Sequence, residues 1–212
     1  EGKDQQINGE AFDLAGNKSI TSAKVSLDKT LPVITATTLP EPNANGWNNA
    51  DVTVTFNGSD SLSGIKSVTY PLTVTSEGAN QVITGEATDY ADNKAVASTN
   101  LNIDKTKPTV TISAAPNTLW PPNNKMVNVT ISGEAIDDLS NIATTTFSVE
   151  DEYNEVEPVL SGFGQTIQLK ASRQGNDKDG RVYTISITTE DKAGNQTSSL
   201  TIVTCPHDQG KK

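Results

Sequence analysis

The stretch QQINGEAFDLAGN at residues 5–17 recurs as QVITGEATDYADN at residues 81–93. The two copies lie 76 residues apart, and the same spacing relates DKTLP at 28–32 to DKTKP at 104–108. A partial third copy, ITTEDKAGN, occupies 187–195. Identities that recur at one fixed spacing are the signature of a chain built from structural repeats. We therefore expect the chain to consist of repeated units of one fold.

Within each unit the sequence alternates apolar residues with Thr, Ser or Asn, as in VTVTF (52–56), VNVTIS (127–132) and YTISITT (183–189). Successive side chains of a β-strand point to opposite faces, so these runs are typical of strands with one buried and one wet face. No useful length of sequence has a helical period, and turn-rich clusters separate the runs at roughly 8–12-residue intervals. The sequence predicts an all-β fold of tandem immunoglobulin-like β-sandwiches, elongated end to end.

The repeated linkers divide the chain into four parts. Residues 1–29 are an incomplete Ig-like repeat, 30–106 and 107–205 are two β-sandwiches of which the second is longer, and 206–212 are a polar tail. In the first sandwich we expect strands at 33–38, 51–57, 65–70, 72–76, 81–88 and 95–103. In the second we expect them at 109–114, 126–135, 142–150, 156–160, 165–172, 181–190 and 197–204.

The first 28 residues match only the last two strands of a repeat. A two-stranded hairpin is at best marginally stable in water, so its apolar side chains need a partner. These side chains are Ile7, Phe12, Leu14, Ile20, Val25 and Leu27. Two explanations stay open: a boundary that cuts through a domain, or another chain that adds strands to the open edges of the hairpin.

Composition narrows the function classes. The 212 residues carry a net charge of −10, which argues against nucleic acid and anionic membranes as partners. No apolar run approaches the length needed for membrane insertion. Cys205 and His207 are the only Cys and His, so the sequence argues against an internal disulfide, a Cys- or His-based metal site and a Ser-His-Asp triad. We expect a protein that is not an enzyme, and, because residue 1 is Glu, a mature or excised chain.

Several longer stretches resemble the bacterial Ig-like (Big-type) repeats of secreted and surface proteins and large adhesins. They are GEATDYADN followed by NIDKTKPTVT, and NGWNNADVTVTFNGSDSLSGIKSVTY. The last unit, with LWPPNNKMV and CPHDQGK, resembles a variant found at the ends of such arrays. The resemblance covers essentially the whole chain and implies a location outside the cell or on its surface. Such modules act as spacers, adhesin stalks and accessory domains of surface enzymes, so it is specific for architecture rather than function.

Six aspartates fall at recurring positions. In an Ig-like sandwich, the loop between the second and third strands and the loop between the last two strands lie at the end where the linker enters. We expect two groups there: Asp28, Asp60 and Asp89 in one sandwich, and Asp104, Asp137 and Asp191 in the next. Clustered carboxylates suit Ca²⁺, which takes six to eight oxygen ligands in flexible geometry, and the resembled adhesins carry Ca²⁺ near such linkers.

A second interpretation of these aspartates stays open. In a DxAGN turn the Asp side chain can simply accept backbone N–H bonds and fix the turn. The sequence thus predicts either Ca²⁺ at the domain junctions or turns that need no metal.

Two further features carry predictions. Trp47 and Trp120 each precede the second strand of a sandwich and are expected to fill the core at its end. The acidic run formed by Glu150, Asp151, Glu152, Glu155 and Glu157 is expected to be a solvated face.

The favoured function is a non-catalytic, extracellular structural or adhesive stalk module whose junctions are rigidified by Ca²⁺. Its expected partners are neighbouring Ig-like domains or copies of itself, together with a surface ligand or glycan. One alternative is an accessory carbohydrate-binding or spacer pair of a secreted hydrolase, which would need an exposed aromatic platform. Another is a filament subunit whose N-terminal hairpin is completed by a neighbouring chain.

Overall fold

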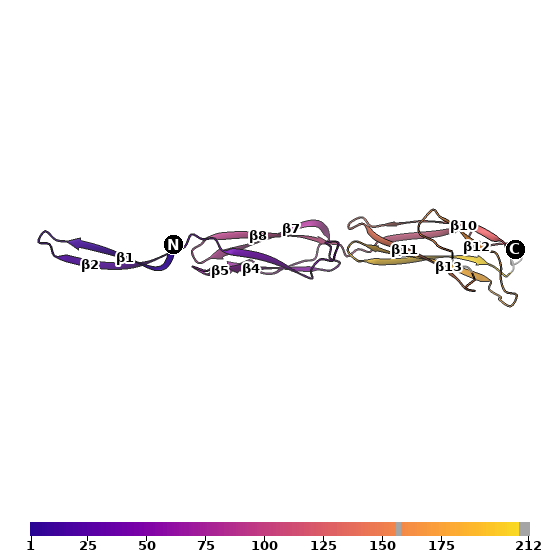
Figure 1. The fold of residues 1–212 in the computed structure, drawn as a ribbon, viewed down its shortest axis with the longest axis horizontal. Helices are drawn as coiled ribbons and strands as arrows, with labels where there is room; N and C mark the ends of the chain where they lie inside the picture. The colour runs from indigo at the N-terminus through magenta and orange to yellow at the C-terminus, as the bar shows by residue number, and fades with distance from the viewer. Residues whose placement is uncertain (156–157, 208–212) are drawn as a thin grey trace. The chain divides into compact units, whose positions relative to one another are not determined.

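The computed structural model describes residues 1–155 and 158–207, in which all regular structure is β (Figure 1). An N-terminal pair consists of β1 (Gly2–Phe12) and β2 (Lys18–Leu27). Six strands follow: β3 (Val33–Leu39), β4 (Val52–Ser59), β5 (Ile65–Val68), β6 (Leu72–Val74), β7 (Gly78–Asp89) and β8 (Lys94–Ile103). The last six are β9 (Thr109–Ala115), β10 (Met126–Ile136), β11 (Ile142–Asp151), β12 (Thr166–Lys170), β13 (Arg181–Asp191) and β14 (Gln196–Cys205). No helix of this described part is long and apolar enough to cross a membrane.

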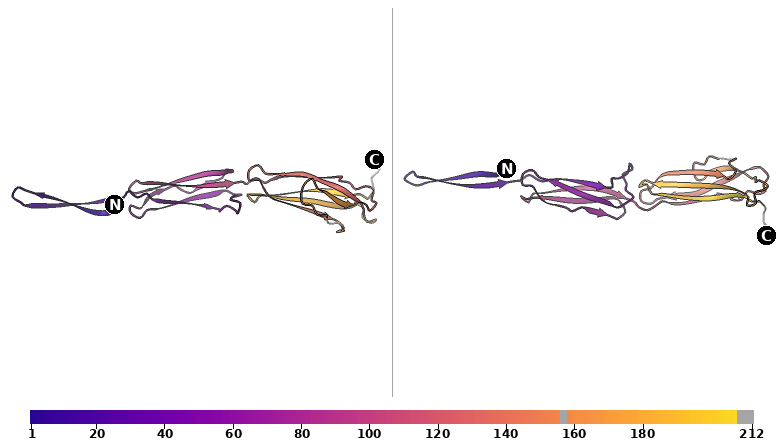
Figure 2. Two further views of the ribbon diagram at one scale, coloured as in Figure 1. Left: turned by 45° about the horizontal axis from the view of Figure 1, so that its top comes forward. Right: turned by 90° about the horizontal axis from the view of Figure 1, so that it is seen from below.

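Each set of six strands forms two three-stranded sheets with the same topology. The sheets are β3-β4-β6 and β5-β7-β8 in the first set, and β9-β10-β12 and β11-β13-β14 in the second. The first, second and fourth strands of a set thus make one layer, and the third, fifth and sixth make the other (Figure 2). The chain is all-β and contains tandem immunoglobulin-like β-sandwiches, as the sequence predicts.

Alternating burial along the strands explains why these residues form sandwiches. In β4, Val52, Val54 and Phe56 are buried while the residues between them are partly exposed. In β13, Tyr183 and Ile185 belong to the same kind of buried row, and they join the core cluster of the second sandwich. The period of two in the sequence is therefore the period of the core-facing side chains.

The N-terminal hairpin reproduces the β7–β8 hairpin in detail. Strands β1 and β2 pair antiparallel, with an irregularity near Gly2. The Gln5 side-chain amide donates to the Gly2 carbonyl at 3.0 Å, and the Gln81 amide donates to the Gly78 carbonyl at 3.2 Å. All hairpin strand residues except the half-buried Gly2 are exposed, because no second sheet of the described residues covers them.

The chain divides into two compact units that do not follow the sequence strictly. The first contains Glu1–Glu41 and Ala50–Asn102, and the second contains Pro42–Asn49 and Ile103–Lys212. The segment between β3 and β4 therefore belongs by its contacts to the second unit, although both strands belong to the first.

All but one of the predicted strands are confirmed to within three residues at each end. The exception is the strand predicted at 156–160. Residues 156 and 157 lie outside the described residues, and 158–160 form no strand. Pro158 begins this stretch and lacks a backbone N–H for pairing, while Leu160 is buried in the core without belonging to a strand.

The prediction for the tryptophans is wrong for Trp120. This side chain is 42% exposed, whereas its neighbour Leu119 is 1% exposed and lies in the core cluster. Of two adjacent apolar residues, the smaller one fills the core. Trp47 is half-buried.

Candidate metal centres

The first carboxylate triad gathers three chain segments at one end of the first sandwich. Asp28 directly follows β2, Asp60 directly follows β4, and Asp89 is the last residue of β7. One carboxylate oxygen from each lies within 4.8 Å of the others. Asp89 is fully buried, and the other two are half-buried.

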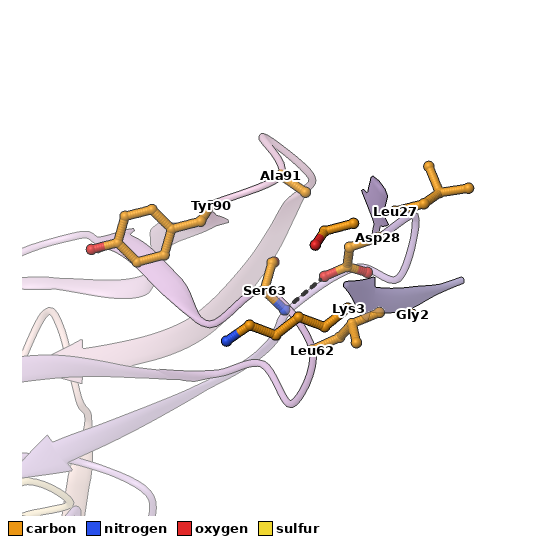
Figure 3. Close-up of a pocket in the computed structure, with 9 residues that line it drawn as sticks. Gly2, Lys3, Leu27, Asp28, Leu62, Ser63, Tyr90 and Ala91 are labelled. Atoms are coloured by element: carbon orange, nitrogen blue, oxygen red, sulfur yellow. Dashed lines mark hydrogen bonds between the residues drawn. The ribbon is translucent and has the colours of Figure 1, made fainter. Parts of the chain in front are cut away.

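Backbone amides hold the first two carboxylates in place. Asp60 Oδ1 accepts hydrogen bonds from the backbone N–H groups of Ser63 and Gly64, both at 2.8 Å. The Ser63 N–H also donates to Asp28 Oδ2 at 3.0 Å (Figure 3). One amide therefore bridges both carboxylates. The Gly64 hydrogen bond is the main cause that lowers the pKa of Asp60 from its ordinary value. Asp60 is therefore ionised at neutral pH.

Asp89 is held by its own turn. Its Oδ1 accepts the backbone N–H groups of Ala91 and Asn93, both at 2.8 Å, and its Oδ2 accepts the Asn93 side-chain amide at 2.8 Å. The Asn93 amide also donates to the Asp28 carbonyl at 3.4 Å. This is the turn geometry that the metal-free interpretation predicts.

The second triad repeats the first. Asp104 follows β8, Asp137 follows β10 and Asp191 ends β13, again with one oxygen each within 4.8 Å of the others. The Ser140 N–H donates to Asp104 Oδ2 at 3.1 Å and to Asp137 Oδ1 at 2.8 Å, as Ser63 does in the first triad. The Asn195 amide donates to Asp191 Oδ2 at 2.8 Å and to the Asp104 carbonyl at 2.9 Å.

Within residues 1–155 and 158–207, no cation forms an ion pair with any of these six carboxylates. Asp92 and, to a lesser extent, the charge of Asp89 nevertheless raise the pKa of Lys66. The Oδ2 atoms of Asp60 and Asp137 accept no hydrogen bond from this described part of the chain. Two like charges about 4 Å apart repel by roughly 4 kcal/mol at an effective dielectric constant of 20. Clustered carboxylate oxygens are ligands of the kind that Ca²⁺ prefers.

The structure thus brings the six aspartates together in the two predicted groups. It also forms the turns of the metal-free interpretation. Most of the hydrogen bonds that fix these turns end on the Oδ1 atom of each aspartate. Sequence reasoning missed the bridging serines, Ser63 and Ser140, and the turn asparagines, Asn93 and Asn195. All four recur at fixed positions of the repeat, so the repeat itself is the signal that marks them.

The solvated-face prediction for the acidic run is wrong at Asp151. Its side chain is fully buried and pairs with the guanidinium of Arg181, whose Nε donates to Asp151 Oδ1 at 2.8 Å. The rings of Tyr153 and Tyr183 lie 4.8 and 5.0 Å from the guanidinium carbon. Asp151 is therefore buried as the partner of a buried cation, which a run of acids does not reveal.

The rest of the acidic run fits the prediction where the structure describes it. Glu150, Glu152 and Glu155 are exposed, and Glu157 lies outside the described residues.

Comparisons with known proteins give little beyond this geometry. No protein-family model matches the chain, and no curated protein matches it. Among solved structures, it is similar to the fibronectin(III)-like modules of CbhA from Clostridium thermocellum, at 14% identity and a TM-score of 0.34. The match covers 82% of this chain and 94% of the other. A TM-score this low supports no inference, so the sandwich assignment rests on strand order and burial.

Proposed function

We propose that the chain is a non-catalytic module of an extracellular structural or adhesive stalk, in which Ca²⁺ binds one carboxylate triad in each β-sandwich. The observation that supports it is the recurrence of the triad. Both sandwiches draw three carboxylates from the same three positions, and none of the six forms an ion pair within the described residues. The sequence resemblance to bacterial Ig-like repeats supports the stalk role and the location outside the cell.

Each aspartate of a triad lies at the end of a strand or directly after it, where the hydrogen bonds of the sheet stop. Asp28 or Asp104 belongs to the segment that enters the sandwich, and the other two carboxylates belong to its loops. Bound Ca²⁺ would supply the positive charge that lets the three carboxylates stay close. Ser63 and Ser140 orient two of the carboxylates in each triad, and Asn93 and Asn195 orient the third.

The turn at the tip of the N-terminal hairpin is an internal reference for the metal-free interpretation. Asp13 Oδ1 accepts the N–H groups of Ala15 and Asn17 at 2.9 and 2.8 Å, as Asp89 does in its own turn. No second or third carboxylate joins Asp13 in a triad within the described residues. The turn therefore forms without a triad, so the matching turns of Asp89 and Asp191 do not themselves require the other two carboxylates.

Calorimetry in EDTA and in roughly 5 mM Ca²⁺ tests the metal, because extracellular modules bind Ca²⁺ with Kd values of about 10⁻⁴–10⁻³ M. A site with a Kd of about 0.1 mM gains about 2 kcal/mol under these conditions. We expect the melting temperature to rise by about 10 °C and to fall back when EDTA removes the metal.

Adjacent aspartates provide matched variants. Asp137→Asn keeps the Oδ1 acceptor but removes one charge of the second triad, so it should abolish the Ca²⁺-dependent rise of the second unit. Asp138→Asn removes an exposed charge next door, outside the triad, and should leave the rise unchanged. Equal melting temperatures of the unsubstituted chain in EDTA and Ca²⁺ would contradict the metal and favour the turns alone.

A further inference from the structure

The segment Pro42–Asn49 packs in the second unit against the turn that carries the second triad. The side-chain amides of Asn43 and Asn45 both donate to the Lys192 carbonyl, at 2.9 and 3.1 Å. Asn48 is 5% exposed and forms a parallel bridge with Ile103. Its carbonyl accepts the backbone N–H of Asp104 at 2.9 Å. Two asparagine amides and one extended backbone segment thus cover this surface.

The repeat places an equivalent surface in the first unit. Tyr90 there corresponds to Lys192, Leu27 to Ile103, and Asp28 to Asp104. The Tyr90 carbonyl accepts no hydrogen bond from the described residues, and the Asp28 N–H donates none. A cavity of about 330 Å³ opens at this place, lined by Leu27, Asp28, Leu62, Ser63, Tyr90 and Ala91 among others (Figure 3). We call these six residues the Tyr90 surface.

The backbone around the Tyr90 surface has the geometry of its occupied counterpart. Asp4 and Asn80 both have positive φ, of 52° and 54°, at matching positions of the hairpins that lead to Leu27 and Ile103. The Tyr90 N–H is bound by the Gly64 carbonyl at 3.0 Å, as the Lys192 N–H is bound by the Asn141 carbonyl at 2.9 Å. The Tyr90 ring points away from Asp28, so it leaves the cavity open (Figure 3).

We propose that the Tyr90 surface is a docking site for an asparagine-rich loop of another β-sandwich, with the chemistry of Asn43–Asn49. Two side-chain amides of that loop donate to the Tyr90 carbonyl, and a backbone carbonyl of its extended part accepts the Asp28 N–H. The partner is thus a sandwich of the same repeat type. The two hydrogen-bonding groups that the loop would satisfy are the ones that lack a partner in the described residues. Docking does not depend on bound Ca²⁺.

The repeat allows a direct test in one chain. Glu1-Gly2 corresponds to Glu77-Gly78, so a copy of residues 30–76 placed directly before Glu1 supplies the remaining strands of a repeat together with its loop. Hydrogen exchange measured by NMR in EDTA should show the Asp28 amide slowed at least about tenfold relative to the parent chain. The carbonyl ¹³C shift of Tyr90 should change as well, because it gains two donors.

A matched control carries Asn43→Asp and Asn45→Ala in the added copy alone. Asn43→Asp keeps the oxygen that accepts the N–H groups of Asn45 and Trp47 and removes only the amide donor. The control should fold equally well but leave the Tyr90 carbonyl shift at its parent value. Protected β1 amides together with an unchanged Asp28 exchange rate would overturn the docking site.

A second experiment uses a peptide, so that the docking site can be tested even when the added strands do not fold. A synthetic peptide of residues 39–52 is titrated into the ¹⁵N-labelled chain in EDTA. Saturable shifts confined to Leu27, Asp28, Tyr90 and Ala91 support the docking site. No saturable change there, up to millimolar peptide, overturns it. The calcium variants leave these outcomes unaffected, so the two proposals can fail separately.

Discussion

Arg181 has no exposed surface, and its guanidinium lies between the rings of Tyr153 and Tyr183. A buried charge requires a partner of opposite charge and satisfied hydrogen bonds. Asp151 supplies the charge, and Ser172 Oγ accepts a further hydrogen bond from Arg181 at 2.7 Å. The Tyr183 hydroxyl in turn donates to the Lys170 carbonyl at 2.9 Å. This cluster fixes the ends of β11, β12 and β13 against one another.

Tyr183 makes the second unit sensitive to alkaline pH. Burial raises the pKa of Tyr183 from 10.0 to about 12. Because the folded pKa lies above the unfolded one, the stabilisation is complete below pH 10 and is lost between pH 10 and 12. A shift of this size corresponds to about 3 kcal/mol at most. We expect the free energy of unfolding, measured with urea, to fall over this range.

Two variants isolate this effect. Burial also raises the pKa of the Cys205 thiol, which acts in the same direction, so the comparison is made in a Cys205→Ala background. Burial raises the pKa of Tyr153 too, and this residue is present in both proteins. Tyr183→Phe should therefore reduce the fall between pH 10 and 12, and the difference between the two proteins measures the part due to Tyr183. Absorbance titration that shows every tyrosine ionising near pH 10 in the folded protein would contradict the burial of this hydroxyl.

At the scale of elements, Gly85 and its equivalent Gly9 show how a covering sheet limits the space beside a hairpin. A Cβ added at Gly85 in β7 would lie 2.5 Å from the Phe56 ring carbon Cγ. Its equivalent in β1 is Gly9, where the nearest atom would be Thr21 Cγ2 at 3.4 Å. The difference arises because β4 covers β7 while nothing in the described part of the chain covers β1.

Gly85→Ala should destabilise the first sandwich by about 1–3 kcal/mol, the usual cost of overpacking a core. Gly9→Ala should change the free energy of unfolding of the first sandwich by less than about 0.5 kcal/mol. Chemical denaturation of the two variants measures both. Similar losses from both substitutions would mean that β1 is also covered in solution.

The strands and the triads were predictable for the same reason. Core-facing rows such as Val52, Val54 and Phe56 leave a period of two in the sequence, and the repeat aligns Asp89 with Asp191. A side-chain pair between two neighbouring strands leaves no such trace. Asp151 continues the inward row of Phe147 and Val149 in β11, but its cationic partner Arg181 is 30 residues away, so the local sequence does not show that this position holds a buried charge pair. The choice of Leu119 over Trp120 for the core depends on packing that adjacent apolar residues do not encode.

At the scale of the whole molecule, stability is unevenly distributed along the chain. The N-terminal hairpin is paired in unbroken register from Gln5 to Phe12 but buries almost no side chain, with Ile7 57%, Phe12 64% and Ile20 59% exposed. Each sandwich has a buried core of its own. Regions with few buried apolar contacts open most easily.

Limited proteolysis should reveal this difference. Trypsin is expected to cleave after Lys18 and Lys24 in β2 well before Lys66 in β5, as mass spectrometry of early fragments would show. The reason is that cleavage needs local opening, which costs least where no core holds the strand. Hairpin sites as resistant as Lys66 would indicate that another copy of the chain covers the hairpin in solution.

The place of Pro42–Asn49 bears on how such a chain can be cut and recombined. A fragment that starts at Ile103 would contain every strand of the second sandwich, yet it would lose the partners of the Lys192 carbonyl and the Asp104 N–H. Those partners lie about sixty residues before Ile103, in the loop between β3 and β4. The unit that can be transplanted intact is therefore defined by contacts in space, and a boundary drawn at the linker would remove a piece of it.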